Sequence, residues 1–235
     1  MNTAYKRYRY PQVIISHAVW LYHRFTLSFR DIEELLACRG IVVTYETIRQ
    51  WCLKLTLSSA KSLRKKQGAL GEQWFLDEVF VKINGKQHYL WRAVDQDGCE
   101  LDILLTKKRD KKSAIKFFKK LFKGQSQQPR KITTDKLASY KAALRELGCN
   151  TSHITGQYQN NIAEISHQKT RQQQRQMRQF SSMSQAQRFL SCHGIINNHF
   201  WQQRHLLKAR HYRLLRDRAF DQWEQVTCVQ NLKIA

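Results

Sequence analysis

Three acidic residues stand out in a chain of 235 residues with a formal net charge of +23: Asp77, Asp135 and Glu164. Carboxylate oxygens are the ligands that hard divalent cations such as Mg²⁺ prefer. Such cations, held at a phosphate, support in-line displacement at phosphorus. A large excess of basic side chains indicates a polyanionic partner, and nucleic acid is the commonest one. Acids and charge together predict metal-dependent cutting or joining of DNA.

Asp77 lies in a predicted strand, where Phe75, Val79 and Val81 share its face at two-residue spacing. The rest of that face is apolar, so the carboxylate is predicted to be buried, and an unpaired buried carboxylate is costly. The alternative is an ion pair between Asp77 and a neighbouring Arg or Lys. Glu78 points to the other face and is interpreted as structural.

Asp135 closes a short predicted strand before a helix, and ligand sites of open α/β sheets gather at the carboxyl ends of strands. The alternative is a helix N-cap, for which Asp is a favoured residue. Glu164 heads a helical face on which basic residues recur every three or four positions. They are His167, Arg171, Arg175 and Arg178. This face predicts a metal ligand leading into a phosphate track, and the alternative is a plain surface helix. Three such carboxylates suit two cations roughly 3.5–4 Å apart.

Residues 1–60 are predicted to form a small all-α domain of three helices, with Ser28 and Asp31 capping the second and Thr44 capping the third. The outward side chains of the third helix predict a helix-turn-helix unit that contacts DNA. They are Tyr45, Arg49, Gln50 and Lys54. An ordinary three-helix bundle with a charged face is the alternative. Residues 61–72 are predicted to be a basic linker.

Residues 73–180 change to a strand period. Asn84-Gly85 and Asp97-Gly98 are hairpin signals, so three antiparallel strands are expected, followed by helix, strand, helix and strand. This order predicts a ribonuclease H-like mixed sheet with flanking helices, an α/β architecture preceded by the helical domain. Residues 181–235 are expected to form a basic helical region packed on this core.

Other features exclude several classes of protein. The six cysteines form no Cys-x-x-Cys pair, which disfavours a zinc site and favours a reducing compartment. The basic N-terminus lacks the apolar core of a signal peptide, and no apolar run is long enough for a membrane span. A cytoplasmic, nucleoid-associated protein without a membrane partner is expected.

Several stretches resemble bacterial DDE transposases of the insertion-sequence-six family. They are WFLDE at 74–78, YLWRAVD at 89–95, TDKLASY at 134–140, NNIAEISHQ at 160–168, QRFLS at 187–191 and QRHL at 203–206. The resemblance implies that Asp77, Asp135 and Glu164 are a catalytic triad that binds Mg²⁺, with Mn²⁺ as a substitute. It also implies binding of terminal inverted repeats, cleavage at 3′ ends and strand transfer into target DNA. The working form would be a homodimer or a higher assembly on double-stranded DNA.

Two rival functions stay open at this point. One is a non-catalytic or domesticated DNA-binding protein, which would bind the same DNA and tolerate loss of Asp77. The other is a ribonuclease H-type nuclease, which would cut RNA–DNA hybrids without joining strands. The predicted helix-turn-helix argues against the nuclease, because reading a sequence in duplex DNA is of little use to a hybrid nuclease.

Overall fold

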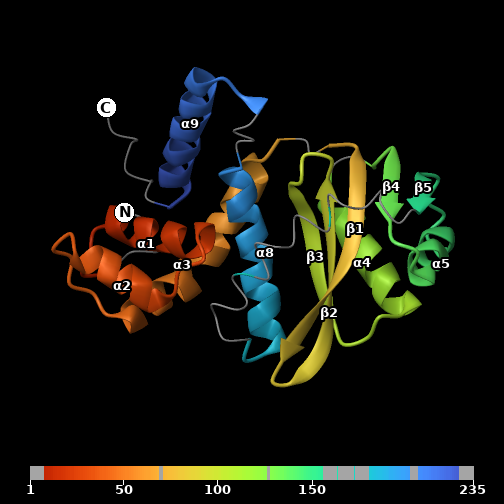
Figure 1. Cartoon of the computed structure of the whole chain (residues 1–235), viewed down its shortest axis with the longest axis horizontal. Helices are drawn as coiled ribbons and strands as arrows, with labels where there is room; N and C mark the ends of the chain where they lie inside the picture. The colour runs from red at the N-terminus through yellow and green to blue at the C-terminus, as the bar shows by residue number, and fades with distance from the viewer. Residues whose placement is uncertain are drawn as a thin grey trace. The chain divides into compact units, whose positions relative to one another are not determined.

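The computed structural model describes residues 8–68, 71–125, 128–155, 163, 172, 180–201 and 206–227 (Figure 1). The chain divides into two compact units. The helical unit comprises Met1–Gln67 and Ile195–Ala235, and the sheet unit comprises Gly68–Gly194. Among the described residues, no helix is both long and apolar enough to cross a membrane.

The helical unit begins with α1 (Gln12–Arg24), α2 (Phe29–Ala37) and α3 (Tyr45–Lys66). The predicted capping pair is confirmed, because Asp31 N donates to Ser28 Oγ (3.1 Å) and Ser28 N donates to Asp31 Oδ2 (2.6 Å). Thr44 is the N-cap of α3 and accepts from the backbone of Thr47. These caps satisfy backbone donors that helix starts leave unpaired, so local sequence defines both starts.

The predicted linker at 61–72 is wrong over its first half, because α3 continues to Lys66. Leu55, Ser59 and Leu63 are buried at four-residue spacing, and this buried stripe carries the helix beyond residue 60. The basic residues near its end are favoured there by the negative end of the helix dipole. The connection from Cys38 to Thr44 is also longer than the roughly three- or four-residue turn of a typical helix-turn-helix.

The C-terminal region was expected to pack on the catalytic core; from Ile195 onward it groups with the N-terminal helices in one compact unit. The end of α8 (Met183–His199) and all of α9 (Ala209–Thr227) group with the N-terminal helices. Trp20 of α1 contacts Phe200 and Phe220, with ring centroids 5.9 and 5.2 Å apart. Packing these large aromatic side chains together removes their surfaces from water. The residues are far apart in the sequence, so the spacing of apolar residues along the chain could not predict this contact.

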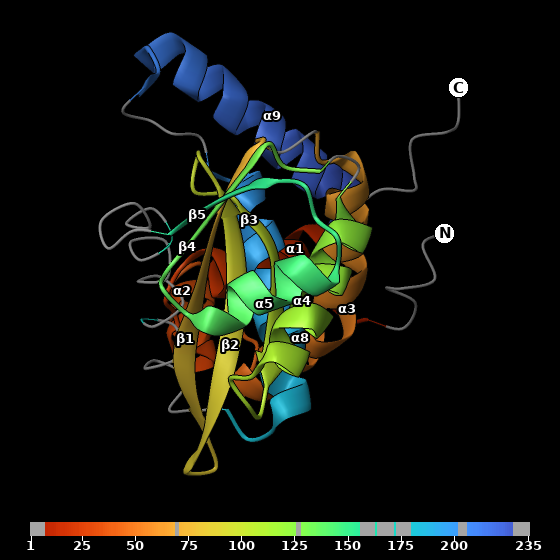
Figure 2. The ribbon, with the colours of Figure 1, turned by 90° about the vertical axis from the view of Figure 1, so that its right-hand side faces the viewer.

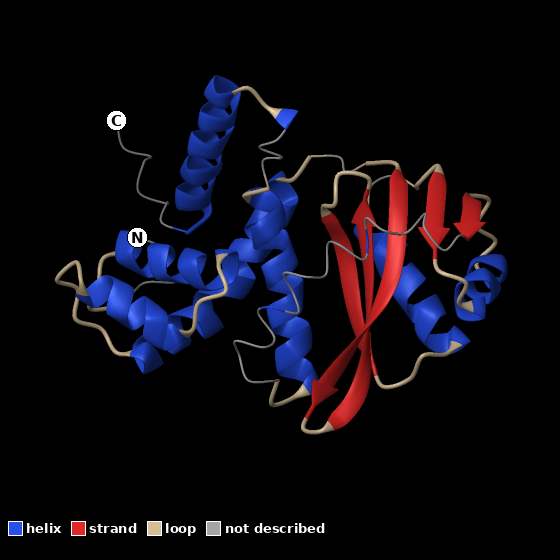
Figure 3. Cartoon of the chain, viewed as in Figure 1, coloured by secondary structure: helices blue, strands red, loops and turns tan. Residues whose placement is uncertain are grey.

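The sheet unit follows the predicted order of elements. Its strands are β1 (Gln73–Ile83), β2 (Lys86–Asp95), β3 (Glu100–Thr106), β4 (Lys131–Thr134) and β5 (Ser152–Thr155), with helices α4 (Lys111–Gly124) and α5 (Ala138–Glu146). The strand order is β3-β2-β1-β4-β5. β1, β2 and β3 pair antiparallel, whereas β4 and β5 add parallel to β1. Helices lie on both sides of this mixed sheet (Figure 3), and the predicted ribonuclease H-like fold is confirmed.

The hairpin between β1 and β2 turns at the predicted dipeptide. Asn84 and Gly85 have φ angles of 48° and 73°. Positive φ at both central residues is the requirement of a type I′ turn, whose twist matches that of the strands. The two-residue turn fixes the register, so Glu78 lies opposite Trp91 and Phe80 lies opposite Tyr89.

The main core lies between one face of the sheet and helices α4 and α5, which lie in front of the sheet in Figure 2. Trp74 and Leu76 of β1 and Trp91 of β2 enter it from the sheet, and Phe118 and Tyr140 enter from the helices. Trp91 and Tyr140 are fully buried, with ring centroids 5.4 Å apart. This packing brings Tyr140 of α5 against Trp91 of β2.

The opposite face of the sheet contacts the first part of α8. Gln187 Oε1 accepts from the backbone of Leu105 on the outer strand β3, at 2.7 Å. A Cβ on Gly194 would stand 1.8 Å from Glu100 Oε1, so the end of the Glu100 side chain would have to shift if this glycine were replaced. Phe75 and Val94, on the same sheet face, form a small cluster with Ala163.

Candidate active site

Asp77, in the middle of β1, and Asp135, directly after β4, lie where the pairing of these two neighbouring parallel strands ends. The last pair in the register of β1 and β4 is Leu76 with Thr134, and each aspartate directly follows its member of that pair. Asp77 is half-buried rather than fully buried, and the Asp135 side chain is 39% exposed. The structure therefore brings together two of the three predicted acids at the carboxyl end of β4, the position where open α/β sheets hold ligands.

Asp135 is held by contacts at the start of the following helix. Its Oδ1 accepts from Leu137 N (3.0 Å), and its carbonyl accepts from Thr134 Oγ1 (2.7 Å). Thr134 Oγ1 also bonds His153 Nε2 on β5 (2.9 Å). The N-cap residue of α5 is Leu137, which makes no side-chain cap, so the alternative of Asp135 as the N-cap is wrong. The carboxylate is nevertheless oriented by a backbone N–H one residue before the helix.

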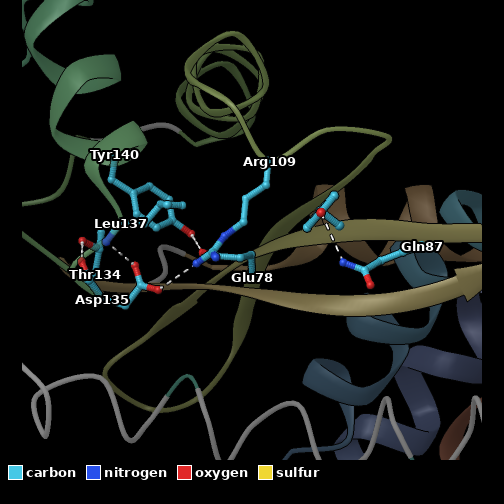
Figure 4. Close-up of polar contacts among 8 residues, drawn as sticks. Glu78, Gln87, Arg109, Thr134, Asp135, Leu137 and Tyr140 are labelled. Atoms are coloured by element: carbon cyan, nitrogen blue, oxygen red, sulfur yellow. Dashed lines mark hydrogen bonds and ion pairs between the residues drawn. The ribbon is translucent and has the colours of Figure 1, made fainter.

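A buried polar network adjoins Asp135, and it is drawn in Figure 4. Arg109 Nη2 donates to Glu78 Oε1 and also approaches Asp135 Oδ2 (3.4 Å). Tyr140 Oη donates to the other oxygen of Glu78, Oε2, at 2.7 Å. The Glu78 side chain is 1% exposed and that of Arg109 is 34% exposed. Arg109 therefore connects a buried carboxylate on β1 with the proposed catalytic carboxylate after β4.

The environment of this network shifts two pKa values. Burial raises the pKa of the Glu78 carboxyl, and the nearby Asp135 carboxylate adds to the rise. The hydrogen bond from Tyr140 and the charge of Arg109 act in the opposite direction. Burial, together with Glu78, raises the pKa of Tyr140 well above its ordinary value. Tyr140 therefore stays a hydrogen-bond donor throughout the physiological range.

Sequence reasoning placed Glu78 on the face of β1 opposite Asp77, with Phe80 and Lys82, and interpreted it as structural, but it did not predict that Glu78 is the buried member of that set. Its carboxylate is buried beneath Tyr140, whereas Phe80 is 55% exposed and Lys82 is exposed. A signal was available, because Trp74 and Leu76 precede Glu78 on the same face by the two-residue period. Arg109 and Tyr140 carried no such signal, since their roles depend on contacts across the fold.

Arg92 stands directly opposite Asp77 on β2. It is buried, and its Nε donates to Glu100 Oε2 at 3.2 Å. The alternative for Asp77 was an ion pair with a neighbouring basic residue, and Arg92 is the basic residue that the register places across from it. Among the described contacts, Arg92 forms an ion pair with Glu100.

Glu164, the third predicted acid, lies outside the described residues, as do His167, Arg171, Arg175 and Arg178. The preceding residue, Ala163, is described. It is 2% exposed and packs with Phe75 and Val94. Phe75 lies two residues before Asp77 on the same face of β1, so the chain passes the Asp77 strand one residue before Glu164. Within the described ranges, no cluster of three acidic, His or Cys side chains forms a metal site.

The four outward residues predicted on the third helix lie on α3, and all are at least partly exposed. Tyr45 is 42% exposed, and the Arg30 guanidinium lies 5.3 Å from its ring centroid. Lys54 is exposed, with Nζ 5.9 Å from the Tyr8 ring centroid. These positions fit a surface that faces a partner, and their role in DNA contact stays a prediction.

The remaining two residues, Arg49 and Gln50, are both bound by Glu46, an acid that sequence reasoning did not consider. Arg49 Nη2 donates to Glu46 Oε1 (2.7 Å), and Gln50 Nε2 donates to the same oxygen (2.9 Å). The hydrogen bonds from Arg49 and Gln50 lower the pKa of Glu46 to about 2. An acid in the first turn therefore holds two side chains that are predicted to contact DNA.

Comparison with known proteins identifies the family. A family model described as a DDE domain matches residues 71–203, which include the whole region of Asp77, Asp135 and Glu164. The transposase for insertion sequence-like element IS431mec of Staphylococcus aureus is 38% identical over 171 residues. That match covers 68% of this chain and 75% of the relative. The chain belongs to the DDE transposases of the insertion-sequence-six family.

A second relative is the transposase for insertion sequence element IS257 in transposon Tn4003 of Staphylococcus aureus. It is 37% identical over 171 residues, which cover 68% of this chain and 75% of the relative. Among solved structures, the catalytic core domain of BIV integrase overlaps 53% of this chain and 82% of its own, with 14% identity and a TM-score of 0.40. The catalytic domain of Mos1 mariner transposase gives 13% identity and a TM-score of 0.37. At such scores the likeness supports no argument, and the fold rests on the strand order.

Proposed function

We propose that this transposase binds the terminal inverted repeats of its element, cleaves at their 3′ ends and joins them to target DNA. Asp77, Asp135 and Glu164 are proposed as the catalytic, metal-binding triad. The observation that carries the proposal is the register of β1 with β4, in which Asp77 and Asp135 each directly follow the last paired residue of their strand. The burial of Ala163 against the strand of Asp77 supports Glu164 as the third member.

The donor set fits a divalent cation, because carboxylate oxygens are hard ligands and both aspartates are partly exposed. We propose that the site binds two Mg²⁺ ions and that Mn²⁺ can substitute for them. When bound, such ions activate a water or a 3′-hydroxyl and neutralise charge at the scissile phosphate. Asp77 and Asp135 would hold them from the sheet, with Glu164 as the third ligand.

Residues around the acids orient the site. The backbone of Leu137 binds Oδ1 of Asp135, so the Oδ2 side of the carboxylate faces Arg109. Arg109 is itself anchored by the buried Glu78. Its guanidinium is one-third exposed, so it is placed to offset the charge of Asp135 before DNA arrives and to contact a phosphate oxygen afterwards.

The DNA-binding part of the proposal concerns two sets of residues. The helical unit would read the terminal inverted repeats through Tyr45, Arg49, Gln50 and Lys54. The helical face predicted after Glu164 would contact phosphates through His167, Arg171, Arg175 and Arg178. The net charge of +23 supports a double-stranded DNA partner, and pairing of two ends requires a homodimer or a higher assembly. Its substrate would place the protein at the nucleoid of a bacterial cytoplasm.

The test is a strand-transfer assay. Purified full-length protein with Mg²⁺ would be given a labelled duplex that carries the repeats flanking its own gene, together with a plasmid target. Joined products are expected with the wild type. Asp77→Asn, Asp135→Asn and Glu164→Gln should each lower joining by roughly 10³-fold or more, because each removes a metal ligand. Chelation should abolish joining, and Mn²⁺ should restore it.

The matched control is Asp221→Asn, an identical charge change on the exposed surface of α9. It should join strands as the wild type does. Repeat binding without any joining would instead mark a non-catalytic DNA-binding protein. Cutting of RNA–DNA hybrids without dependence on the repeats would favour a ribonuclease H-type nuclease.

A further inference from the structure

The face of the sheet that carries Glu78 continues past the helices as an aromatic pair, exposed Phe80 and half-buried Tyr89. Phe80 is 55% exposed, and Tyr89 lies opposite it in the register of β1 and β2. Their ring centroids are 5.6 Å apart, with the ring planes at 68°. Gln87 Nε2 donates to the Tyr89 hydroxyl at 3.2 Å, so the second ring is held in place.

Positive charge surrounds this pair. Arg109 Cζ lies 6.0 Å from the Phe80 ring centroid. Lys82, two residues along the same strand, shares the face of Phe80 and is exposed. Thr106 lies opposite Tyr89 on β3, and exposed Lys107 directly follows it. A single exposed aromatic residue is ordinary in proteins, but a ring pair among cations matches the surfaces that bind single-stranded nucleic acid.

The pair also adjoins the proposed active site. Phe80 lies two residues beyond Glu78 on β1, which is roughly 6–7 Å of strand. Arg109 spans that interval, since it contacts Glu78 and Asp135 and also lies over Phe80. Asp77 lies on the other face of β1, so the link between the rings and the proposed acids is Arg109, which contacts Asp135. A phosphate at the acids would therefore put a neighbouring base within reach of the rings.

We propose that Phe80 and Tyr89, with Arg109, form a stacking platform for an unpaired nucleotide next to the scissile phosphate. The base stacks on the aromatic pair, while Arg109 and Lys82 contact its flanking phosphates. Fraying of the DNA end onto the platform would hold the scissile phosphate at the acids. This inference rests on the proposed function for its substrate, and it assigns a role to residues outside the triad.

The test compares two DNA probes by fluorescence anisotropy, with full-length protein and without divalent cation so that no strand is cut. One probe is a blunt duplex that carries a terminal repeat. The other has the same repeat and ends in a few unpaired nucleotides. Phe80→Leu keeps apolar bulk and removes the ring, and it should weaken binding of the second probe by roughly 5- to 150-fold. Binding of the blunt duplex should stay unchanged.

Phe80→Tyr keeps the ring and should restore the preference for unpaired ends. Removing each unpaired base in turn as an abasic site supplies a thermodynamic cycle. When the abasic site is at the stacked position, the wild type should bind that probe as weakly as Phe80→Leu binds the intact probe. Combining Phe80→Leu with the abasic probe should then lower the affinity no further than either change alone. Phe25→Leu, the same substitution at a residue 44% exposed in the helical unit, should affect both probes equally.

Equal affinity of Phe80→Leu and wild type for the unpaired probe would overturn the platform, whatever the strand-transfer assay shows. A Phe80→Leu protein whose self-association falls without DNA, as seen by sedimentation, would also overturn it and assign the rings to a second copy of the chain. If the ring-dependent preference persists but wild-type protein joins no strands, the platform stands and the proposed transposition chemistry falls.

Discussion

The ion pair between Arg109 and Glu78 provides a quantitative test of the network at the active site. Arg109→Gln would leave the Glu78 carboxylate, 1% exposed, with Tyr140 as its remaining described hydrogen-bond donor. Breaking a buried ion pair by removing one partner costs about 3–5 kcal/mol. The Arg109 side chain is 34% exposed, so water screens the pair and the expected loss is smaller, about 2–3 kcal/mol. For a chain of this length that corresponds to a fall in Tm of roughly 5–10 °C.

The reciprocal change should be milder. Glu78→Gln removes the buried charge and keeps an oxygen that can accept from Tyr140, so we expect a loss of about 1 kcal/mol. The double variant removes both charges and should resemble Glu78→Gln alone. The coupling energy of this cycle is therefore expected to be about 2–3 kcal/mol in magnitude. The asymmetry follows because a buried carboxylate without a cation is costlier than an exposed guanidinium without an acid.

Urea denaturation followed by tryptophan fluorescence would measure the three variants, with Arg145→Gln as the control. Arg145 is exposed in α5, and the same substitution there should change stability by less than about 0.5 kcal/mol. If Arg109→Gln is no more destabilising than this control, or if the double variant equals the sum of the single ones, the network is not an energetic unit. The proposal that Arg109 is anchored by Glu78 would then be refuted.

Two further predictions concern the helical unit. Glu46→Gln should strengthen binding of repeat DNA by roughly 2- to 5-fold in anisotropy titrations, because it releases Arg49 and removes a negative charge. Exposed Glu224→Gln is the control, and weaker binding would mean that Glu46 orients Arg49 for contact. Burial lowers the pKa of His199, whose Nε2 lies 2.7 Å from the Ala219 carbonyl, below its ordinary 6.5. The unfolded chain then takes the proton more readily, so this stabilising contribution is complete above pH 6.5 and is lost as pH falls below it. Thermal melts from about pH 7.5 to about pH 5.5 should show a smaller loss for His199→Gln than for wild type, and parallel curves would contradict this.

Much of the sheet unit was predictable because its signals are local. Alternating burial, the Asn84-Gly85 turn and the short run ending at Asp135 each depend on neighbours within a few residues. The order of strands and helices then restricts the topology to a handful of sheets. Asp77 and Asp135 were predicted individually as acids of one site, and the parallel register of β1 with β4 accounts for their adjacency.

The helix starts at Ser28 and Thr44 were also local, since capping is a matter of side chains reaching the first turn. The end of α3 was missed because basic composition was interpreted as a linker, although Leu63 continues the buried stripe. Composition describes solubility and charge, whereas burial at helical spacing decides where a helix ends.

By itself, then, the sequence determined the family, the order of elements and the acids that are proposed to carry the chemistry, because each is expressed in residue type and spacing. The tertiary structure alone decided which residues surround them. Tyr140 contacts Glu78 across 62 residues of chain, and Arg109 contacts it across 31. The grouping of Ile195–Ala235 with the N-terminal helices is likewise a long-range choice. Such contacts depend on which surfaces exclude water together in the folded chain, and no local pattern carries that information.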